Sequence, residues 1–246
     1  MSVAKLIGVG VGPGDPELMT LKAMRALGEA EIIAYFAKAG HASHSLTTAT
    51  PHLRNGATRL PLLYPVTTEL PKCSDRYRDA IRDFFDGAAA TLAAHLEAGR
   101  TVAVICEGDP LFYGSYMHLH ARLAPRFTTE IVAGITGMSG CWSAAGMPIA
   151  QGDDVFTVLP ATLPEDELAR RLAEADAAVV MKVGRHLPKL RRALGRSGQL
   201  QRAIYVERGT MADAKMIPLV AKLDDDAPYF AVVLVPGWQT RPGAAK

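Results

Sequence analysis

Short uncharged runs of apolar residues alternate, in the first half of the chain, with longer stretches in which apolar residues recur every three or four positions. Runs of the first kind predict strands buried on both faces of a parallel sheet, and stretches of the second kind predict the helices that cover it. The predicted strands lie near residues 5–10, 31–37, 58–63 and 101–106. Because helical stretches separate most of them, the pattern predicts an α/β domain.

The second half of the chain predicts a different sheet. A strand at 129–132 and a helix at 136–145 come first, and helices are then expected near 165–175 and 186–195. Five further strands are predicted at 155–159, 177–183, 203–207, 216–220 and 229–235. The last strands follow one another directly, which indicates an antiparallel or mixed sheet. With the boundary placed near residue 124, the expected fold is two α/β domains, 1–123 with a parallel sheet and 124–246 with a mixed one.

Two of the predicted strands end abruptly in turns with the sequence Gly-Asp-Pro, at 14–16 and 108–110. Ligands of open parallel sheets bind outside the carboxyl ends of the strands, so residues 107–115 are expected to line a pocket. One such turn is equally well explained as an ordinary strand-to-helix connection, and its recurrence favours a binding function. Gly108 is expected to have no room for a side chain, while the carboxylate of Asp109 is expected to hold the loop in shape.

Alternate glycines at 8, 10, 12 and 14 precede the first of these turns, and their spacing separates classes of ligand. A dinucleotide fingerprint requires Gly-x-Gly-x-x-Gly, but Pro13 occupies the third glycine position, and Glu31 opens the second strand instead of closing it. No Lys-Ser or Lys-Thr pair follows, as a phosphate-binding P-loop requires. The spacing thus disfavours an NAD-type oxidoreductase, which stays an alternative together with a non-catalytic ligand sensor on the same scaffold.

In these motifs the chain resembles the tetrapyrrole methylases, which bind S-adenosylmethionine in the cleft between two α/β domains. The resemblance rests on residues 8–22, 107–116 and 132–148. Three further runs, 35–37, 108–118 and 181–185, are most similar to members that methylate C-20 of precorrin-2 in cobalamin biosynthesis. The resemblance implies a methyltransferase with S-adenosylmethionine as donor, a tetrapyrrole substrate, no metal and a homodimer. Cobalt-precorrin-2, uroporphyrinogen III and precorrin-4 remain alternative substrates.

The resemblance also implies which residues form the site. The donor-binding positions fall on Pro13, Glu107, Gly108, Asp109, Phe112, Thr136, Gly137, Met181, Val183, Gly209 and Thr210. The candidate substrate contacts are Arg185, Lys182, Gly12, His41, His44 and Ser115. No catalytic residue is assigned, because methyl transfer depends chiefly on the proximity and orientation of the reactants. Glu107 departs from the family pattern, which more often has glycine, leucine or another small uncharged residue there, and Ala133 replaces the usual proline.

Basic residues are concentrated between 182 and 208, a stretch that contains eight Lys or Arg residues and a single acidic residue, Glu207. We interpret Arg191, Arg192 and Arg196 as a solvated helix face. Lys182 and Arg185 instead follow a predicted buried strand, and they are expected to bind the carboxylates of the tetrapyrrole. Two histidines at 118 and 120 stand two apart on a predicted helix, so they point to different faces, which argues against a metal site.

The composition narrows the remaining classes of function. The formal net charge of +2 is too small to indicate a nucleic-acid partner by itself. No apolar run approaches the roughly 18 residues of a membrane helix, and the N-terminus lacks the layout of a signal peptide. The three cysteines, at 73, 106 and 141, form no Cys-x-x-Cys motif, so reduced thiols and a cytoplasmic location are expected. The apolar run 229–235 is a further reason to expect a homodimer.

Overall fold

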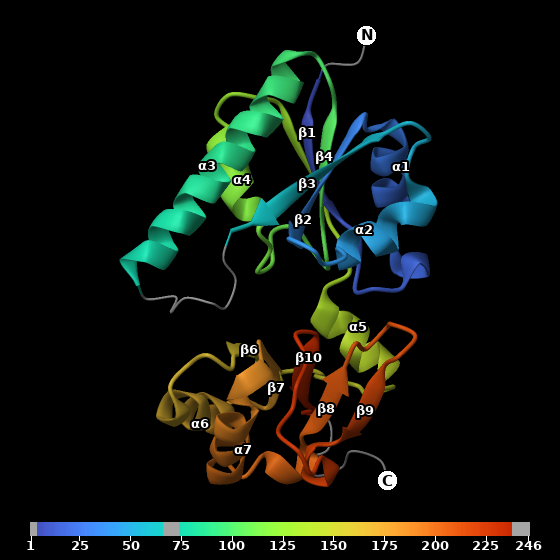
Figure 1. Cartoon of the computed structure of the whole chain (residues 1–246). Coiled ribbons are helices and arrows are strands. Elements are labelled where there is room, and N and C mark those ends of the chain that lie inside the picture. The colour runs from blue at the N-terminus through green and yellow to red at the C-terminus, as the bar shows by residue number, and fades with distance from the viewer. Residues whose placement is uncertain (1–3, 66–73, 238–246) are drawn as a thin grey trace. The chain divides into compact units, whose positions relative to one another are not determined.

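A computed structural model describes residues 4–65 and 74–237 of the chain, which divides after Gly137 into two compact units (Figure 1). Each unit is built around its own five-stranded sheet. Among the described residues, no helix is both long and apolar enough to span a membrane. The two α/β units predicted from the sequence are therefore present.

The first unit contains a parallel sheet with the strand order β3-β2-β4-β1-β5. Its elements are β1 (Leu6–Gly10), α1 (Leu21–Glu29), β2 (Ile32–Lys38), α2 (His44–Ala49), β3 (Thr58–Tyr64), α3 (Asp75–Glu97), β4 (Val102–Cys106), α4 (Tyr116–Leu123) and β5 (Thr129–Val132). Two 3-10 turns, η1 (Pro16–Leu18) and η2 (Thr50–His52), follow β1 and α2. The predicted parallel sheet is confirmed.

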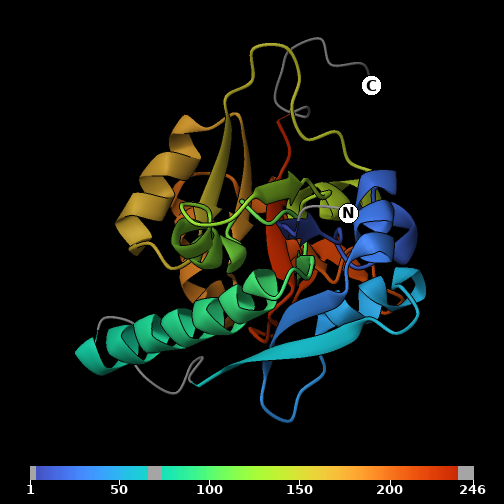
Figure 2. The same ribbon diagram turned by 90° about the horizontal axis from the view of Figure 1, so that it is seen from above.

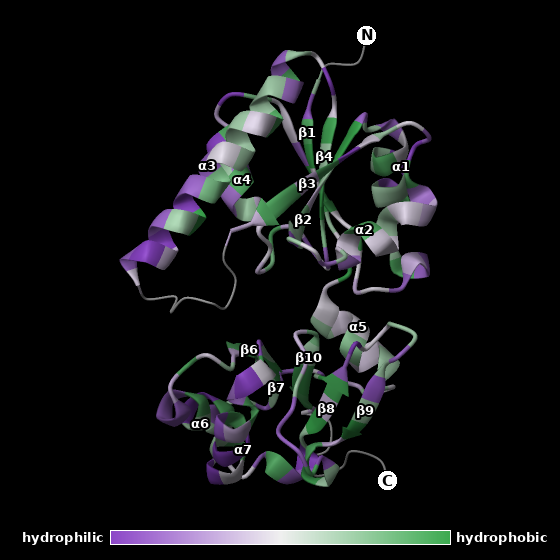
Figure 3. Cartoon of the chain, in the orientation of Figure 1, coloured by the Kyte–Doolittle hydropathy of each residue, from purple (hydrophilic) through white to green (hydrophobic). Residues whose placement is uncertain are grey.

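Helices cover both faces of this sheet, as Figures 1 and 2 show. Alternate residues of β1 point to opposite faces, so Leu6 joins the core beneath α3 and α4, while Ile7 joins the core beneath α1 and α2. Every residue of β1 and β4 is buried, and the strands are correspondingly apolar in Figure 3. This two-sided burial explains why the strands read as continuous apolar runs instead of alternating ones.

Asp15 and Pro16 are residue types that often begin an α-helix, but here they begin a 3-10 turn that is separate from α1. Asp15 caps only the 3-10 turn η1, where its Oδ1 accepts a hydrogen bond of 2.9 Å from the Glu17 N–H. Met19 is extended, and α1 starts after Thr20, whose Oγ1 accepts a hydrogen bond from the Ala23 N–H at 3.1 Å. Two N-cap side chains five residues apart therefore start two separate elements.

The second unit contains a mixed sheet with the strand order β6-β7-β10-β8-β9. β6 and β7 are parallel, whereas β10 is antiparallel to both of its neighbours and β9 is antiparallel to β8. The strands are β6 (Phe156–Pro160), β7 (Ala177–Met181), β8 (Ile204–Glu207), β9 (Lys215–Pro218) and β10 (Ala231–Val235). The helices α6 (Glu165–Glu174) and α7 (Leu187–Arg196) belong to the core on one face, and α5 (Gly137–Ala144) covers the other. The predicted mixed sheet is confirmed.

The boundary between the units lies after Gly137 and not near residue 124. The strand β5, which we assigned to the second domain, pairs with β1 from Leu6–Thr129 to Val9–Val132 and thereby completes the first sheet. A run of four residues carries no local signal that identifies its partner strand, so the sequence pattern could not place it.

The run 229–235 also has a role different from the expected one. Its strand, β10, lies between β7 and β8 at the centre of the second sheet, and all five of its residues are buried. A central strand presents no free edge to a second copy of the chain. The expectation of a homodimer therefore rests on the family resemblance alone.

Candidate functional site

Three loops cross above the carboxyl end of β1, and glycine is required at the crossing. A Cβ atom built on Gly134 would lie 2.0 Å from the carbonyl oxygen of Gly108, and one built on Gly10 would lie 2.5 Å from the same oxygen. Gly12 and Gly108 form an isolated antiparallel bridge, in which the Gly108 N–H donates to the Gly12 carbonyl at 2.8 Å. The loops that follow β1, β4 and β5 are thus in direct backbone contact at one edge of the sheet.

The line of alternate glycines is filled in part by the protein itself. A Cβ on Gly8 would meet the Tyr116 ring at 2.4 Å, so this glycine makes room for a fully buried tyrosine of α4. Burial raises the pKa of the Tyr116 phenol above its ordinary value. Gly12 has a φ of +82°, a value that favours glycine. Gly8 and Gly10 therefore make room for other parts of the protein itself.

The carboxylate of Asp109 fastens the Gly-Asp-Pro loop, as expected. Its Oδ1 accepts a hydrogen bond of 2.9 Å from the Leu111 N–H, and its Oδ2 accepts one of 3.1 Å from the Gly134 N–H. One side chain therefore ties the loop after β4 to the loop after β5. Such charge-assisted bonds to backbone N–H groups are among the stronger hydrogen bonds in proteins.

The reason for glycine at position 108 is different from the one we expected. A Cβ there would lie 3.4 Å from the Gly137 nitrogen and 3.6 Å from the Thr136 Cα, which are ordinary contacts. The constraint is the backbone angle φ of +67°, which side chains with a Cβ rarely adopt. The same distances place Thr136 and Gly137 beside Gly108, so these three predicted donor-binding residues lie together.

The predicted site residues of the second unit follow the ends of two parallel strands. Met181 ends β7 and Val183 follows it, whereas Gly209 and Thr210 follow β8. Because β7 and β8 are both antiparallel to β10, their carboxyl ends share one edge of the sheet. Gly209 has no space for a side chain, since a Cβ there would lie 2.8 Å from the Cα of Cys141 in α5.

Strained backbone marks the same loops in both units. Tyr113, Lys182 and Arg208, with φ values of 55°, 56° and 49°, are the non-glycine residues with positive φ in the described part of the chain. Each adjoins a predicted donor-binding residue, namely Phe112, the pair Met181 and Val183, and Gly209. Such conformations are costly, and they cluster at binding and active sites. The signal was not readable from the sequence, because none of the three positions is a glycine.

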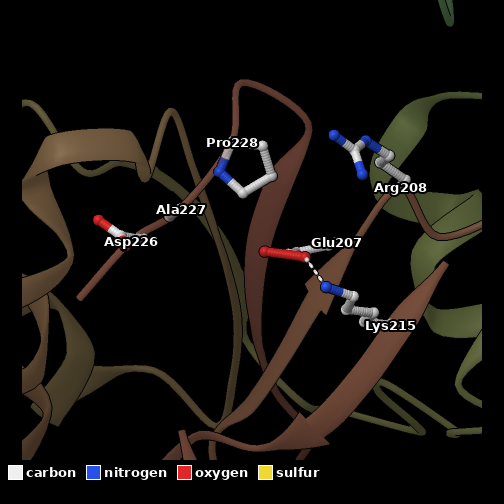
Figure 4. Close-up of a pocket in the computed structure, with 6 residues that line it drawn as sticks. All are labelled: Glu207, Arg208, Lys215, Asp226, Ala227 and Pro228. Atoms are coloured by element: carbon white, nitrogen blue, oxygen red, sulfur yellow. Dashed lines mark ion pairs between the residues drawn. The ribbon is translucent and has the colours of Figure 1, made fainter. Parts of the chain in front are cut away.

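A hollow of about 400 Å³ adjoins the Gly209 turn in the second unit (Figure 4). It is lined by Glu207, Arg208, Lys215, Asp226, Ala227 and Pro228. Glu207 is buried, and its Oε1 accepts a hydrogen bond of 2.8 Å from the Tyr205 hydroxyl. Both cations of the hollow are paired, Lys215 with Glu207 at 3.9 Å and Arg208 with Asp213 at 2.6 Å. The charges of the hollow are therefore largely satisfied within the protein.

Most of the candidate substrate-binding side chains are exposed, but that of Ser115 is hydrogen-bonded within the protein. Lys182 and Arg185 are exposed after β7, and His41 and His44 are exposed in the loop before α2 and at its first residue. The hydroxyl of Ser115 is hydrogen-bonded to that of Tyr64. Tyr64 is part of an aromatic cluster that we did not predict, with its ring centroid 5.6 Å from that of Phe36 and 4.7 Å from that of Phe84. These rings belong to β2, β3 and α3, so no single local pattern in the sequence brings them together.

The two histidines of α4 have separate partners, in agreement with their spacing. The ring of His118 stacks on Phe85 of α3, with 4.3 Å between the centroids. The Nδ1 of His120 lies 3.3 Å from the hydroxyl oxygen of Tyr116.

The prediction that Arg191 belongs to a solvated helix face is wrong. Its guanidinium donates to the carbonyl oxygens of Leu219, Lys222 and Asp224 at 2.5–3.1 Å and to Asp225 Oδ1 at 3.0 Å. Its side chain is only 21% exposed. Arg191 therefore holds the segment after β9 in place, a role set by a segment about thirty residues away.

The exposure of the two other arginines of α7 agrees with the prediction. Arg192 and Arg196 pair with Glu165 and Asp166 of α6, and their side chains are 60% and 53% exposed.

Comparisons with a family model and with curated proteins indicate the same family. The model of the Tetrapyrrole (Corrin/Porphyrin) Methylases matches residues 5–224. A precorrin-2 C(20)-methyltransferase from Sinorhizobium sp is 60% identical over 98% of this chain and 99% of its own length. A cobalt-precorrin-2 C(20)-methyltransferase from Salmonella typhimurium is 28% identical over 94% of this chain and 95% of its own.

The fold agrees with that of solved structures. A cobalt precorrin-4 methyltransferase of cobalamin biosynthesis superposes with a TM-score of 0.72 at 23% identity, covering 97% of this chain and 96% of its own. Since the family match extends over nearly the whole chain and includes both sets of strand-end loops, the alternative of an NAD-type oxidoreductase is set aside. The chain belongs to the tetrapyrrole (corrin/porphyrin) methylase family.

Proposed function

We propose that this chain is an S-adenosylmethionine-dependent C-methyltransferase that methylates C-20 of precorrin-2, giving precorrin-3A and S-adenosylhomocysteine in cobalamin biosynthesis. The relative from Sinorhizobium sp, 60% identical over nearly the full length of both chains, is the observation that carries the choice of substrate. The 28% identity to a relative that is named for the cobalt-loaded precursor makes that substrate the second choice.

The residues of the strand-end loops fit a compact donor. The loop at Gly108 has a backbone conformation fixed by its positive φ and by the Asp109 carboxylate, so its backbone groups are preorganised. In the second unit the Oγ1 atom of Thr210 is buried and has no hydrogen-bond partner in the described part of the chain. A buried hydroxyl without a partner is costly, and a polar group of the donor would satisfy it.

When bound, S-adenosylmethionine supplies an electrophilic methyl group on a sulfonium. The protein contributes by binding the donor through the backbone of its glycine loops and by orienting the tetrapyrrole carbon toward it. Proximity and orientation can account for about 7–11 kcal/mol of a reaction barrier. This explains why the glycine loops are more prominent than titratable groups among the proposed donor-binding residues.

The substrate side of the proposal rests on the exposed cations after β7. Tetrapyrrole precursors are rich in carboxylates, and a guanidinium binds a carboxylate through two parallel hydrogen bonds. The guanidinium of Arg185 has no hydrogen-bond or ion-pair partner within residues 4–65 and 74–237, so it is available for such a contact. We also propose that His41, His44 and Ser115 contact the substrate, that the protein forms a homodimer and that it acts in the cytoplasm.

The purified protein should be incubated with labelled donor and, separately, with precorrin-2, cobalt-precorrin-2, uroporphyrinogen III and precorrin-4. Mass spectrometry should show one added methyl group on precorrin-2, and the isotope label should be at C-20. Preferential methylation of another tetrapyrrole would change the substrate, and donor binding without turnover on any of them would favour the sensor alternative.

Replacing Arg185 by alanine tests the substrate contact. The loss of a guanidinium that pairs with a desolvated carboxylate should weaken tetrapyrrole binding by about 2–5 kcal/mol and leave donor affinity nearly unchanged. Arg192→Ala is the control, because that arginine is exposed and pairs within α6 and α7. Equal, small losses in both variants would show that Arg185 does not bind the substrate.

A further inference from the structure

Methylation of a meso carbon leaves one proton to be removed. Such a carbon bears a single hydrogen, so its attack on the methyl group produces a tetrahedral carbon that carries both the new methyl and the original hydrogen. The conjugated ring system is restored only when the hydrogen leaves as a proton. A group with a free lone pair near the substrate would accelerate this step, and general bases of this kind contribute about 10²–10⁴-fold.

Few carboxylates in the first unit are placed to accept that proton. Asp15 and Glu17 follow β1, and Glu107 and Asp109 follow β4, so all four lie past carboxyl ends of the parallel sheet. Both oxygens of Asp109 accept backbone hydrogen bonds, whereas Asp15 and Glu17 lie three and five residues past Gly12 of the loop crossing, at the start of η1. Glu107 is the residue directly after β4 and directly before Gly108 of the loop crossing.

Glu107 combines a fixed position with an available oxygen. Its Oε1 accepts a hydrogen bond of 3.0 Å from the N–H of Ser45, which is 1% exposed in α2. The Oγ atoms of Ser45 and Ser43 lie 3.0 Å apart in the same buried corner, so the anchor is itself held. The residue is exposed, and its Oε2 has no hydrogen-bond partner among the residues that the structure describes. One oxygen thus positions the carboxylate, and the other is available at the carboxyl end of β4.

We propose that Glu107 is the base that removes the C-20 proton; this inference rests on the proposed function. The ring system donates an electron pair to form the bond between C-20 and the methyl carbon. The bond between that carbon and sulfur breaks, leaving its electron pair on a neutral thioether. The C-20–H bond then breaks, its electron pair returns to the ring system, and the proton passes to Oε2 of Glu107 and from there to water.

The test compares Glu107→Gln with a matched control. The glutamine carbonyl oxygen still accepts the hydrogen bond from Ser45, but the side chain is no longer basic. Glu31→Gln is the control, since Glu31 accepts a backbone hydrogen bond of 3.1 Å from the Thr101 N–H at the opposite edge of the same sheet. Donor affinity by calorimetry, thermal midpoint, kcat for precorrin-2, and the isotope effect with deuterium at C-20 are measured for both variants and for the unaltered protein.

We expect Glu107→Gln to lower kcat at least about 100-fold. Donor affinity and thermal midpoint should match those of Glu31→Gln, because the substitution leaves unchanged the backbone of position 107, through which the donor is proposed to bind. The deuterium isotope effect should be larger in this variant than in the unaltered protein, because removal of the proton becomes the slow step. A kcat within threefold of the control would overturn the inference, as would a loss of donor affinity that accounts for the loss of activity. If the unaltered protein methylates no meso carbon, the proposed function fails first and the inference fails with it.

Discussion

Replacing Gly134 by alanine would place a methyl group where three loops cross. The added Cβ would lie 2.0 Å from the carbonyl oxygen of Gly108 and 2.8 Å from the Cα of Gly10. Relief of the first contact alone requires the two loops to separate by about 1 Å or more, and both neighbours are backbone atoms that cannot rotate away. The hydrogen bond from the Gly134 N–H to Asp109 would be lost with that movement.

Overpacking of a side-chain core usually costs about 1–3 kcal/mol, and a clash between backbone segments belongs at the upper end of that range or above it. For a chain of this size we expect a fall of roughly 6–12 °C in the thermal midpoint, measured by circular dichroism. Donor binding, measured by calorimetry, should be lost because the Gly108 loop is displaced.

Gly87→Ala is the matched control. This glycine lies within α3, has no atom within 4 Å of the built Cβ and has no positive φ, so alanine should stabilise the protein by about 0.5–1 kcal/mol. The reasoning would be refuted if Gly134→Ala unfolded within about 0.5 kcal/mol of the unaltered protein and bound the donor with at most a threefold change in affinity.

Three further outcomes are expected. Arg191→Ala should lower the free energy of unfolding in urea by about 2–3 kcal/mol, because its guanidinium holds three backbone carbonyls, whereas Arg192→Ala should cost under about 1 kcal/mol. Burial lowers the pKa of His95, so the unfolded chain binds the extra proton and stability should rise as the pH rises toward the ordinary histidine pKa; His95→Gln should flatten that slope in urea titrations. Burial raises the pKa of the Cys106 thiol to about 12 and of the Cys141 thiol to about 11, so neither should react with iodoacetamide at pH 8 in the folded protein, as peptide mass mapping can test.

Each of these outcomes has a result that would contradict it. Equal losses in the two arginine variants would mean that the segment after β9 does not depend on Arg191. An unchanged pH slope in the histidine variant would assign the slope to other groups. Alkylation of either buried cysteine in folded protein would show that its surroundings open under native conditions.

Local patterns predicted the central strands β1, β4 and β10 most clearly because every residue of these strands is buried. The run 102–106 lies between a helical layer on either side, so every residue in it is apolar and the strand is unmistakable in the sequence. The start of α4 was less readable. Leu111 opens a stretch with helical spacing, but the left-handed conformation of Tyr113 and the tight packing of Gly114 on Pro110 delay the helix until Tyr116. Such a turn depends on backbone contacts that residue types do not reveal.

In the candidate site, too, local motifs identified positions, but contacts between distant segments decide what some of the residues do. The resemblance supplied the predicted donor-binding positions in both units, and the structure groups several of these positions within each unit. It could not supply the reason for Gly134, which is the carbonyl of Gly108 on another strand-end loop. The role of Arg191 likewise depends on where the segment after β9 passes. Contacts between segments far apart in the sequence decide these roles, and hydrophobic periodicity carries no information about them.

The central place of β10 has a consequence for the order of events during synthesis. The first sheet is complete once residue 132 has been made, so the first unit can fold while translation continues. The second sheet cannot join β7 to β8 until residues 231–235 emerge, because β10 is the strand that lies between them. Until then the apolar side chains of β6, β7, β8 and β9 cannot be buried in a completed sheet. The window in which the second unit is exposed to chaperones and proteases is therefore set by the time needed to translate its last described strand.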